Sequence, residues 1–281
     1  MKVILSRKGF DSSAGGKPSP HFVETGRLLS LPIPEDNNNQ IDIGRTYDDL
    51  RFDEQITYLD IMKQLGLKNF SDKYVHMDPD INSTVQNNRN PDWRGLFGQS
   101  GSSQSHLNNK SIKKDDLFLF FGWFNDVCKS SNSYSYTSGT DRHIIWGYLQ
   151  VDDVQKIIPG KKYEDWKNDH PHYYYRKRDN NVAYVARKEL SFAPGIPGYG
   201  IFNYKDSLVL TCPGQKNRSL WKLPSFFHPK SGTIMSYHEN NSIWEFYDKY
   251  CTLNTVGRGQ EFVIEGNDEV IDWAKKLFAN M

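Results

Sequence analysis

Two segments rich in glycine and hydroxyl groups carry residues that can bind an anion or move a proton. The first begins near the N-terminus and places Arg7, Lys8 and Asp11 ahead of Gly15 and Gly16. Glycines allow backbone N–H groups to turn toward an anion, and the two cations can complete a phosphate cradle. No Gly-Lys-Ser/Thr sequence ends this segment, so it is not a Walker loop. A solvated surface loop is the alternative interpretation.

The second such segment, residues 93–107, offers two amides and an imidazole. Gln99 and Gln104 can read the edge of a base, and His106 can accept or release a proton near neutral pH. The segment runs almost directly into the most apolar stretch of the chain, which would hold it in place. A flexible surface loop is again the alternative.

A third cluster has the spacing of a divalent-metal site or of an acid–base pair. In residues 75–81 the alternation of a strand would put His76, Asp78 and Asp80 on one face. Pro79 disfavours a regular strand through Asp80, so the three side chains can diverge. In the structural alternative the carboxylates cap a turn and His76 makes a hydrogen bond in the core.

Further along, two histidines precede a run of aromatic and basic residues. His170 and His172 have no cysteine partner and no glutamate four residues on, so they are a weak metal signal. The tyrosines and three cations of residues 173–178 can stack on a nucleotide and neutralise its charge. An edge strand protected by charge explains the same pattern equally well.

The most apolar runs predict the elements that position these segments. Residues 117–124 are aromatic and follow two aspartates, which favours a strand buried on both faces. A second apolar run, residues 143–151, follows a polar loop at 125–142, so the two runs are predicted to pair antiparallel. This pair is the predicted spine of the core.

Shorter patterns complete the predicted fold. Apolar residues predict strands over 1–5 and 28–34. Helical spacing predicts helices over 47–65 and 267–281, the second capped by Asn267. We therefore expect an α+β protein with a central mixed or barrel-like sheet and flanking helices.

Composition narrows the class of protein. The chain has 281 residues and a net charge of +1, which excludes a broad basic surface for non-specific nucleic-acid binding. A mononucleotide or a single flipped-out base suits this charge balance better than a long duplex. Cys128, Cys212 and Cys251 form neither a zinc signature nor a disulfide framework, which indicates a reducing cytoplasm. With no apolar leader, membrane span or long linker, we expect one cytoplasmic domain over residues 1–281.

Six ordered motifs span nearly the whole chain. They are SRKGFDSS with the following GG and PSP (residues 6–20), LSLPIP (29–34), HMDPD (76–80), FGQ through HL (97–107), DLFLFFGW (116–123) and GQEF (259–262). Together they resemble the nucleotide modification associated domain family, third type. The resemblance implies a protein of phages or bacteria that acts in or around DNA base modification. It implies no particular mechanism or cofactor.

A looser likeness concerns the predicted strand pair. The runs at residues 115–121 and 144–151 are similar to the strand pair of PUA-like domains of the EVE and ASCH types. That likeness implies a small barrel with a pocket for a modified base, lined by Trp123, Trp146 and Tyr148.

The first hypothesis is an enzyme that acts on the base or sugar of a nucleotide in phage or bacterial DNA modification or defence. Arg7 and Lys8 hold the phosphate in the glycine-rich loop. The candidate catalytic residues are Asp11, Asp78 and His106. The candidate substrate-binding residues are Arg7, Lys8, Gly15, Gly16, Gln99, Gln104, Trp123, Gln260 and Glu261.

The second hypothesis is a reader that stacks a flipped modified base in the PUA-like pocket without chemistry. Metal-dependent hydrolysis through His76, Asp78 and Asp80 is a minor third hypothesis. The cofactor is unknown, and the expected partner is a nucleotide or a single base in DNA, with no membrane. All three hypotheses need distant loops to converge on one hollow.

Overall fold

The computed structural model describes residues 1–35, 44–131, 133–174, 179–257, 259–279 and 281. Its α-helices are α1 (Tyr58–Gln64), α2 (Gly101–Asn109), α3 (Pro171–Tyr174) and α4 (Asp268–Lys276). Its strands are β1 (Val3–Arg7), β2 (Ser19–Phe22), β3 (Arg27–Leu28), β4 (Leu96–Gln99), β5 (Leu117–Ser130), β6 (Ser133–Tyr136), β7 (Arg142–Lys156), β8 (Val182–Ala186), β9 (Glu189–Leu190), β10 (Ala193–Pro197), β11 (Tyr199–Ile201), β12 (Leu220–Pro224), β13 (Ile234–Met235), β14 (Trp244–Phe246), β15 (Tyr250–Asn254) and β16 (Glu261–Glu265). The predicted α+β class is confirmed.

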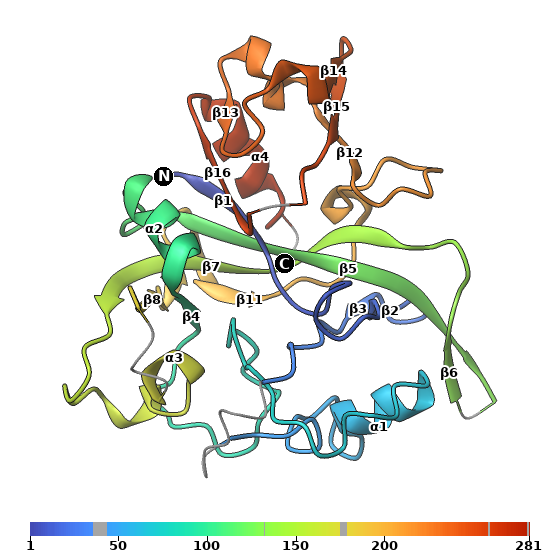
Figure 1. Cartoon of the computed structure of the whole chain (residues 1–281), viewed down its shortest axis with the longest axis vertical. Coiled ribbons are helices and arrows are strands. Elements are labelled where there is room, and N and C mark those ends of the chain that lie inside the picture. Colours follow the sequence, from blue (N-terminus) through green and yellow to red (C-terminus); the bar gives the residue numbers. More distant parts are fainter. Residues whose placement is uncertain (36–43, 132, 175–178, 258, 280) are drawn as a thin grey trace.

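One large mixed sheet dominates the molecule (Figure 1). Its main path runs β13-β16-β1-β5-β7-β8-β4, and β2, β3, β6 and β11 pair beside that path. The two ends of the path, β13 and β4, do not pair with each other, so the sheet is open and the barrel-like alternative is not formed by the described strands. β12, β15 and β14 form a separate three-stranded sheet.

The two longest strands form the predicted antiparallel spine. β5 and β7 pair from Leu117 with Gln150 to Phe124 with Arg142, and a register shift follows Phe120. The facing apolar side chains are buried in the main core. The polar loop predicted over residues 125–142 is shorter than expected, because β5 continues to Ser130 and turns into β6.

β1 and β2 both run parallel to β5, one after the other along its length. The glycine-rich segment between them therefore leaves the sheet beside the middle of β5. Lys8 N donates to Phe121 O at 2.9 Å there. A Cβ on Gly122 would lie 2.6 Å from the carbonyl oxygen of Lys8, so only glycine permits this close approach.

Three predicted elements differ from the structure. Residues 93–107 are not a loop, because they contain β4 and most of α2. The helix predicted over 47–65 is limited to α1, since Asp53 Oδ1 accepts hydrogen bonds from the backbone N–H groups of Gln55 and Ile56 and holds a turn instead. The strand predicted over 28–34 ends at Leu28.

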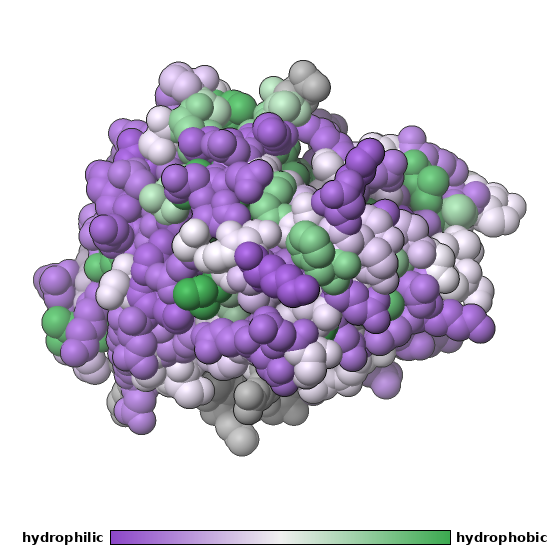
Figure 2. All heavy atoms as spheres, turned by 90° about the horizontal axis from the view of Figure 1, so that it is seen from above, coloured by the Kyte–Doolittle hydropathy of each residue, from purple (hydrophilic) through white to green (hydrophobic). Residues whose placement is uncertain are grey.

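The C-terminal part of the chain extends the main sheet beside the N-terminal strand. β16 pairs antiparallel with β1, and α4 follows with Asn267 as its N-cap, as predicted. The face seen in Figure 2 is mostly hydrophilic, with small separate apolar areas. Within the described ranges, the structure contains no helix whose length and apolar character would let it cross a membrane.

Candidate functional site

A cavity of about 380 Å³ lies between the loop after β1 and the segment before β16. The sheet brings five parts of the chain to it: β1 with its loop, β5, β7, the segment before β12 and the segment before β16. The lining residues of this Arg7 cavity are Arg7, Phe10, Asp11, Ser12, Ser13, Trp123, His143, Arg218, Ser219, Gly257, Gly259 and Gln260. Four residues singled out from the sequence, Arg7, Asp11, Trp123 and Gln260, thus share one cavity.

Arg7, the last residue of β1, is held by two backbone carbonyl groups. Its Nη2 donates to the carbonyl oxygens of Gly257 and Gly259, each at 2.7 Å. Burial lowers the pKa of Arg7, an effect that Asp11 opposes. Because the ordinary pKa of arginine lies above about 12, the guanidinium stays charged at neutral pH.

Arg218 brings a second guanidinium group to the cavity. Its Nη2 donates to Ser12 Oγ at 2.7 Å, and its Cζ lies 4.2 Å from the centre of a Trp123 ring. Across the described ranges, Ser12 is the only hydrogen-bond acceptor of this guanidinium, so its other N–H groups can donate to a ligand. The contact with Trp123 holds the group in place before a ligand arrives.

Asp11 places a carboxylate on the cavity wall. Its Oδ1 accepts hydrogen bonds from the backbone N–H groups of Ser13 and Ala14 and from the Ser13 hydroxyl, each at 2.7 Å. Burial works to raise the pKa of Asp11, but these hydrogen bonds and the charge of Arg7 outweigh it and lower the pKa. The carboxylate is therefore ionised at neutral pH, and Oδ2, for which no donor occurs among the described residues, can accept from a ligand.

The two glycines of this loop shape it and do not line the cavity. Gly15 and Gly16 have φ values of +83° and +67°, in the region that favours glycine. A Cβ on Gly15 would overlap the ring of Phe10, and Gly16 N donates to Asp11 O at 2.9 Å. They hold the turn that presents Asp11.

His143 on β7 lines the cavity, although nothing in the sequence marked it as a site residue. Its Nδ1 accepts a hydrogen bond from Trp221 Nε1 at 3.0 Å. Burial lowers the pKa of His143 to about 3, and the charges of Arg218 and Arg7 add to this effect. A neutral imidazole that accepts at Nδ1 carries its proton on Nε2, so His143 is a hydrogen-bond donor at neutral pH.

Lys8, Gln99 and Glu261 meet in a buried cluster beside the cavity. Lys8 Nζ lies 3.0 Å from Glu261 Oε1, and Gln99 Nε2 donates to the same oxygen at 2.7 Å. Glu261 is 1% exposed, and its Oε2 has no hydrogen-bond partner among the described residues. These three predicted substrate-binding residues contact one another and do not line the cavity.

The α2 candidates also lie outside the lining of the cavity. His106 Nε2 is 3.0 Å from Ser236 Oγ, and its ring stacks at a tilt 4.6 Å from that of Tyr237. Burial lowers the pKa of His106. Gln104 is fully buried, and its Nε2 donates to Tyr184 OH at 3.0 Å.

Asp78 is the centre of a second buried cluster, with three histidines. The Nε2 atoms of His76, His170 and His172 lie 3.9, 3.3 and 3.7 Å from its carboxylate oxygens. Gly98 N, on the open edge of β4, donates to Asp78 Oδ1 at 2.7 Å. Burial works to raise the pKa of Asp78, but His170, His172 and His76 together outweigh this effect and lower the pKa. Burial lowers the pKa of His172 to about 3. The cluster thus combines an ionised carboxylate with a neutral imidazole.

Asp80 turns away from this cluster. Its carboxylate accepts two hydrogen bonds from Arg89, at 2.6 and 2.8 Å, and its backbone pairs with Leu96. The strand alternation that would have aligned it with His76 and Asp78 is absent, because the segment forms no regular strand. The structure brings two members of this predicted trio together and separates the third.

The aromatic residues of the predicted PUA-like pocket do not share one hollow. Trp146 and Tyr148 are 4% and 1% exposed and belong to the main core, whereas Trp123 lines the Arg7 cavity. Of the predicted aromatic and basic run, residues 175–178 lie outside the described residues, and Tyr173 is fully buried.

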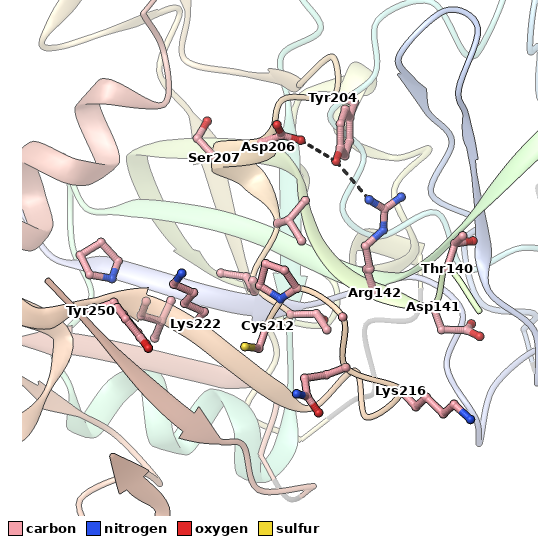
Figure 3. Close-up of a pocket in the computed structure, with 18 of the residues that line it drawn as sticks. Thr140, Asp141, Arg142, Tyr204, Asp206, Ser207, Cys212, Lys216, Lys222 and Tyr250 are labelled. Carbon is pink, nitrogen blue, oxygen red and sulfur yellow. Dashed lines mark hydrogen bonds between the residues drawn. The ribbon is translucent and has the colours of Figure 1, made fainter. Parts of the chain in front are cut away.

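A larger groove of about 1060 Å³ is lined in part by residues 212–216, close along the chain to Arg218 and Ser219 of the Arg7 cavity. Figure 3 shows this groove. Lys216, Lys222 and Tyr250 lie along it, and Arg142 Nη1 donates to the hydroxyl of Tyr204 at 3.1 Å. The groove therefore offers cations and aromatic rings next to the cavity.

Comparison with known proteins places this geometry in a family. The chain matches the family model of nucleotide modification associated domain 3 over residues 2–265, which include the whole lining of the Arg7 cavity and the whole Asp78 cluster. The chain belongs to this family. The resemblance found in the sequence is thereby confirmed. Neither the curated proteins nor the solved structures gave a match.

Membership of the nucleotide modification associated domain 3 family links the chain to nucleotide modification. Within this family member, the Arg7 cavity gathers groups suited to an anionic ligand: two guanidiniums, three serine hydroxyls and an indole. Arg218 and His143 were missed in the sequence, since each lies beside an apolar run and far along the chain from Arg7.

Proposed function

We propose that this protein binds a nucleotide in the Arg7 cavity and modifies its base or sugar. The ligand is a free nucleotide or a single base flipped out of DNA. The observation that carries the proposal is the pair of guanidinium groups, Arg7 and Arg218, which come from distant segments and are both held by protein partners in one cavity.

The charge of the cavity suits a phosphate. Among the described lining residues, Arg7 and Arg218 contribute two positive charges and Asp11 contributes the one carboxylate. Guanidinium groups donate in a planar fork that matches the oxygens of a phosphate, and fixed groups lose little freedom when they bind. The volume of about 380 Å³ falls within the range of about 300–1000 Å³ typical of small-molecule sites.

The remaining polar groups suit the rest of a nucleotide. Asp11 Oδ2 can accept a proton or hydrogen bond from a sugar hydroxyl or a base N–H, and we assign it the role of general base. His143 Nε2–H can donate to a base carbonyl or ring nitrogen. Gln260 lines the same wall.

The other residues predicted from the sequence support the cavity in this proposal. Lys8, Gln99 and Glu261 join the end of β1 to β4 and β16 and so stabilise the fold around the cavity. His106 stays a candidate for proton transfer from outside the lining, and Asp78 lies in the separate histidine cluster. The family description supports a link to nucleotide modification. The setting that we propose is a phage or bacterial DNA modification or defence system in the cytoplasm.

Isothermal titration with deoxynucleoside monophosphates and the matching nucleosides tests the binding step. We expect the monophosphate to bind at least about tenfold more tightly than the nucleoside, because charge-assisted hydrogen bonds contribute about 1.5–3 kcal/mol each. Arg218→Gln should remove this preference. Lys216→Gln is the matched control, since it deletes one charge from the same segment on the side of the larger groove. Equal losses in the two variants would contradict the proposal.

Mass spectrometry of the nucleosides in DNA tests the chemical step. Cells that express the wild-type protein should contain a modified nucleoside that is missing with Asp11→Asn. If the two DNA samples are identical while Arg218-dependent binding persists, the enzyme is refuted. The reader, which binds a modified base through Trp123 without chemistry, would then be the function.

A further inference from the structure

We infer that His76, Asp78 and His172 form a binding site for one divalent transition-metal ion, which goes beyond the proposed function and uses none of the residues that line the Arg7 cavity. One ligand atom from each residue lies within 4.8 Å of the other two. His76 and Asp78 come from the segment after Val75, and His172 comes from α3. All three side chains are at least nine-tenths buried.

The hydrogen bonds of the two imidazoles point their free nitrogens at Asp78. His76 Nδ1 lies 2.7 Å from Glu35 Oε2, and His172 Nδ1 lies 2.5 Å from Asn181 Oδ1. A carboxylate and an amide oxygen accept hydrogen bonds, so each Nδ1 carries a proton and each neutral ring keeps its lone pair on Nε2. This arrangement, in which the outer ring nitrogen is held by an oxygen, is the usual support for a metal-binding histidine.

Asp78 has one oxygen held by the protein and one oxygen facing the imidazoles. Oδ1 accepts from Gly98 N at 2.7 Å and lies 3.3 Å from His170 Nε2. Oδ2 lies 3.9 Å from His76 Nε2 and 3.7 Å from His172 Nε2. Three lone-pair atoms thus converge without a proton between them, and a cation among them would satisfy all three.

His170 supports the site and is not a fourth ligand. Its Nδ1 accepts a hydrogen bond from His172 N at 3.3 Å, so its proton lies on Nε2, which is 3.3 Å from Asp78 Oδ1. A nitrogen that carries a proton has no lone pair for a metal. The ligand set therefore has two nitrogens and one oxygen.

This ligand set selects the class of ion. Two imidazoles and a carboxylate suit Zn²⁺, Fe²⁺, Co²⁺ or Mn²⁺, whereas Mg²⁺ and Ca²⁺ prefer oxygen ligands alone. Three protein ligands leave a position for water or substrate. Asp78 also lines a cavity of about 30 Å³ together with Gly9 and Trp146, which has room for a water molecule.

The backbone of β4 leaves room for the side chain of His172 beside Asp78. A Cβ on Gly98 would overlap the imidazole ring of His172, so glycine at this position of β4 makes room for the ring. Asn181 holds the ring from the other side, because its Nδ2 also donates to His172 O at 2.8 Å. The position of His172 is thus fixed by two neighbours before any ion arrives.

Metal analysis of the full-length protein tests the inference. The protein is stripped with a chelator, incubated separately with Zn²⁺, Fe²⁺, Co²⁺ and Mn²⁺, desalted and measured by elemental mass spectrometry. We expect about one equivalent of at least one ion in the wild type and X-ray absorption from nitrogen and oxygen ligands at about 2.0–2.2 Å. His172→Ala should lose the ion, whereas His228→Asn, a matched loss of a buried histidine elsewhere, should retain it.

A milder variant keeps the inference testable if His172→Ala does not fold. Asn181→Leu keeps all three ligands and should weaken metal binding about 10–100-fold, as loss of a supporting hydrogen bond does elsewhere. Wild-type protein that holds less than about a tenth of an equivalent of every ion would overturn the inference. Undiminished metal content in both variants would overturn it as well. Nucleotide titration of the Arg7 cavity is a separate readout, so the two proposals can fail independently.

Discussion

Replacing Lys8 with methionine tests whether this lysine stabilises the fold or binds substrate. Lys8 Nζ is 3.0 Å from Glu261 Oε1, and the two side chains are 10% and 1% exposed. Lys8→Met leaves the carboxylate buried with Gln99 Nε2 as its remaining side-chain donor among the described residues. Breaking a buried pair in this way costs about 3–5 kcal/mol of the free energy of unfolding.

The double variant separates loss of charge balance from loss of packing. Lys8→Met with Glu261→Gln removes both charges and keeps an acceptor for Gln99, so most of the lost stability should return. The lost contact between Lys8 and the Phe97 ring, 4.6 Å from ammonium to centroid, leaves a deficit of about 0.5–2 kcal/mol. Lys110→Met is the matched control, since it breaks a pair with Glu265 in which the two side chains are 24% and 29% exposed, and it should cost at most about 1 kcal/mol.

Urea denaturation and thermal melting measure these differences. For 281 residues and an unfolding entropy of about 2.1 cal/mol/K per residue, the single variant should melt about 5–9 °C below the wild type. Its nucleotide affinity at lower temperature should stay within about threefold of wild type, a change below about 0.7 kcal/mol. A stable Lys8→Met protein that no longer binds nucleotide would refute this reasoning and restore Lys8 as a substrate-binding residue.

Three further predictions concern the frame of the cavity. Gly122→Ala should destabilise the protein by about 1–3 kcal/mol in urea, because its Cβ would lie 2.6 Å from the carbonyl oxygen of Lys8; an unchanged midpoint would contradict the close approach. The pKa of His143 is lowered to about 3 in the folded protein, below its unfolded value of about 6.5. Between these two values the unfolded state binds more protons than the folded state. The free energy of unfolding should therefore fall as the pH drops from about 6.5 toward 3. His143→Gln should flatten that fall, measured as urea midpoints at pH 7.5 and 4.5, and an equally steep fall would show that other groups cause it. Asn267→Ala removes the N-cap of α4 and should cost about 1 kcal/mol, and no loss in melting temperature would show that the cap is dispensable.

The central strands were predictable because their signal is local. The aromatic run at 117–124 and the apolar run at 143–151 contain more apolar residues than a strand with one face in water would have. Burial on both faces therefore follows from the residues themselves. The α4 cap at Asn267 is equally local. Residues 93–107 were predicted as a loop because they are rich in glycine and hydroxyl groups, yet most of α2 lies there, where burial of Leu107 outweighs propensity.

The site residues were predictable only where they lie in segments of unusual composition. Arg7 and Asp11 stand in a conspicuous glycine-rich loop, whereas Arg218 reaches the same cavity from more than 200 residues away. The Asp78 cluster shows the same limit: His172 was a weak metal signal because no partner lies near it in sequence, and its partners, His76 and Asp78, are brought to it by the fold. Spacing in a sequence describes neighbours along the chain, while these contacts depend on how β1, β4 and β5 are placed.

A crystal structure with a bound deoxynucleoside monophosphate tests the central claim most directly. We expect phosphate oxygens within hydrogen-bonding distance, about 2.7–3.2 Å, of the guanidinium nitrogens of Arg7 and Arg218, with the base or sugar facing Asp11 and His143. A nucleotide seated in the larger groove along Lys216 and Tyr250, with no contact to either arginine, would contradict it.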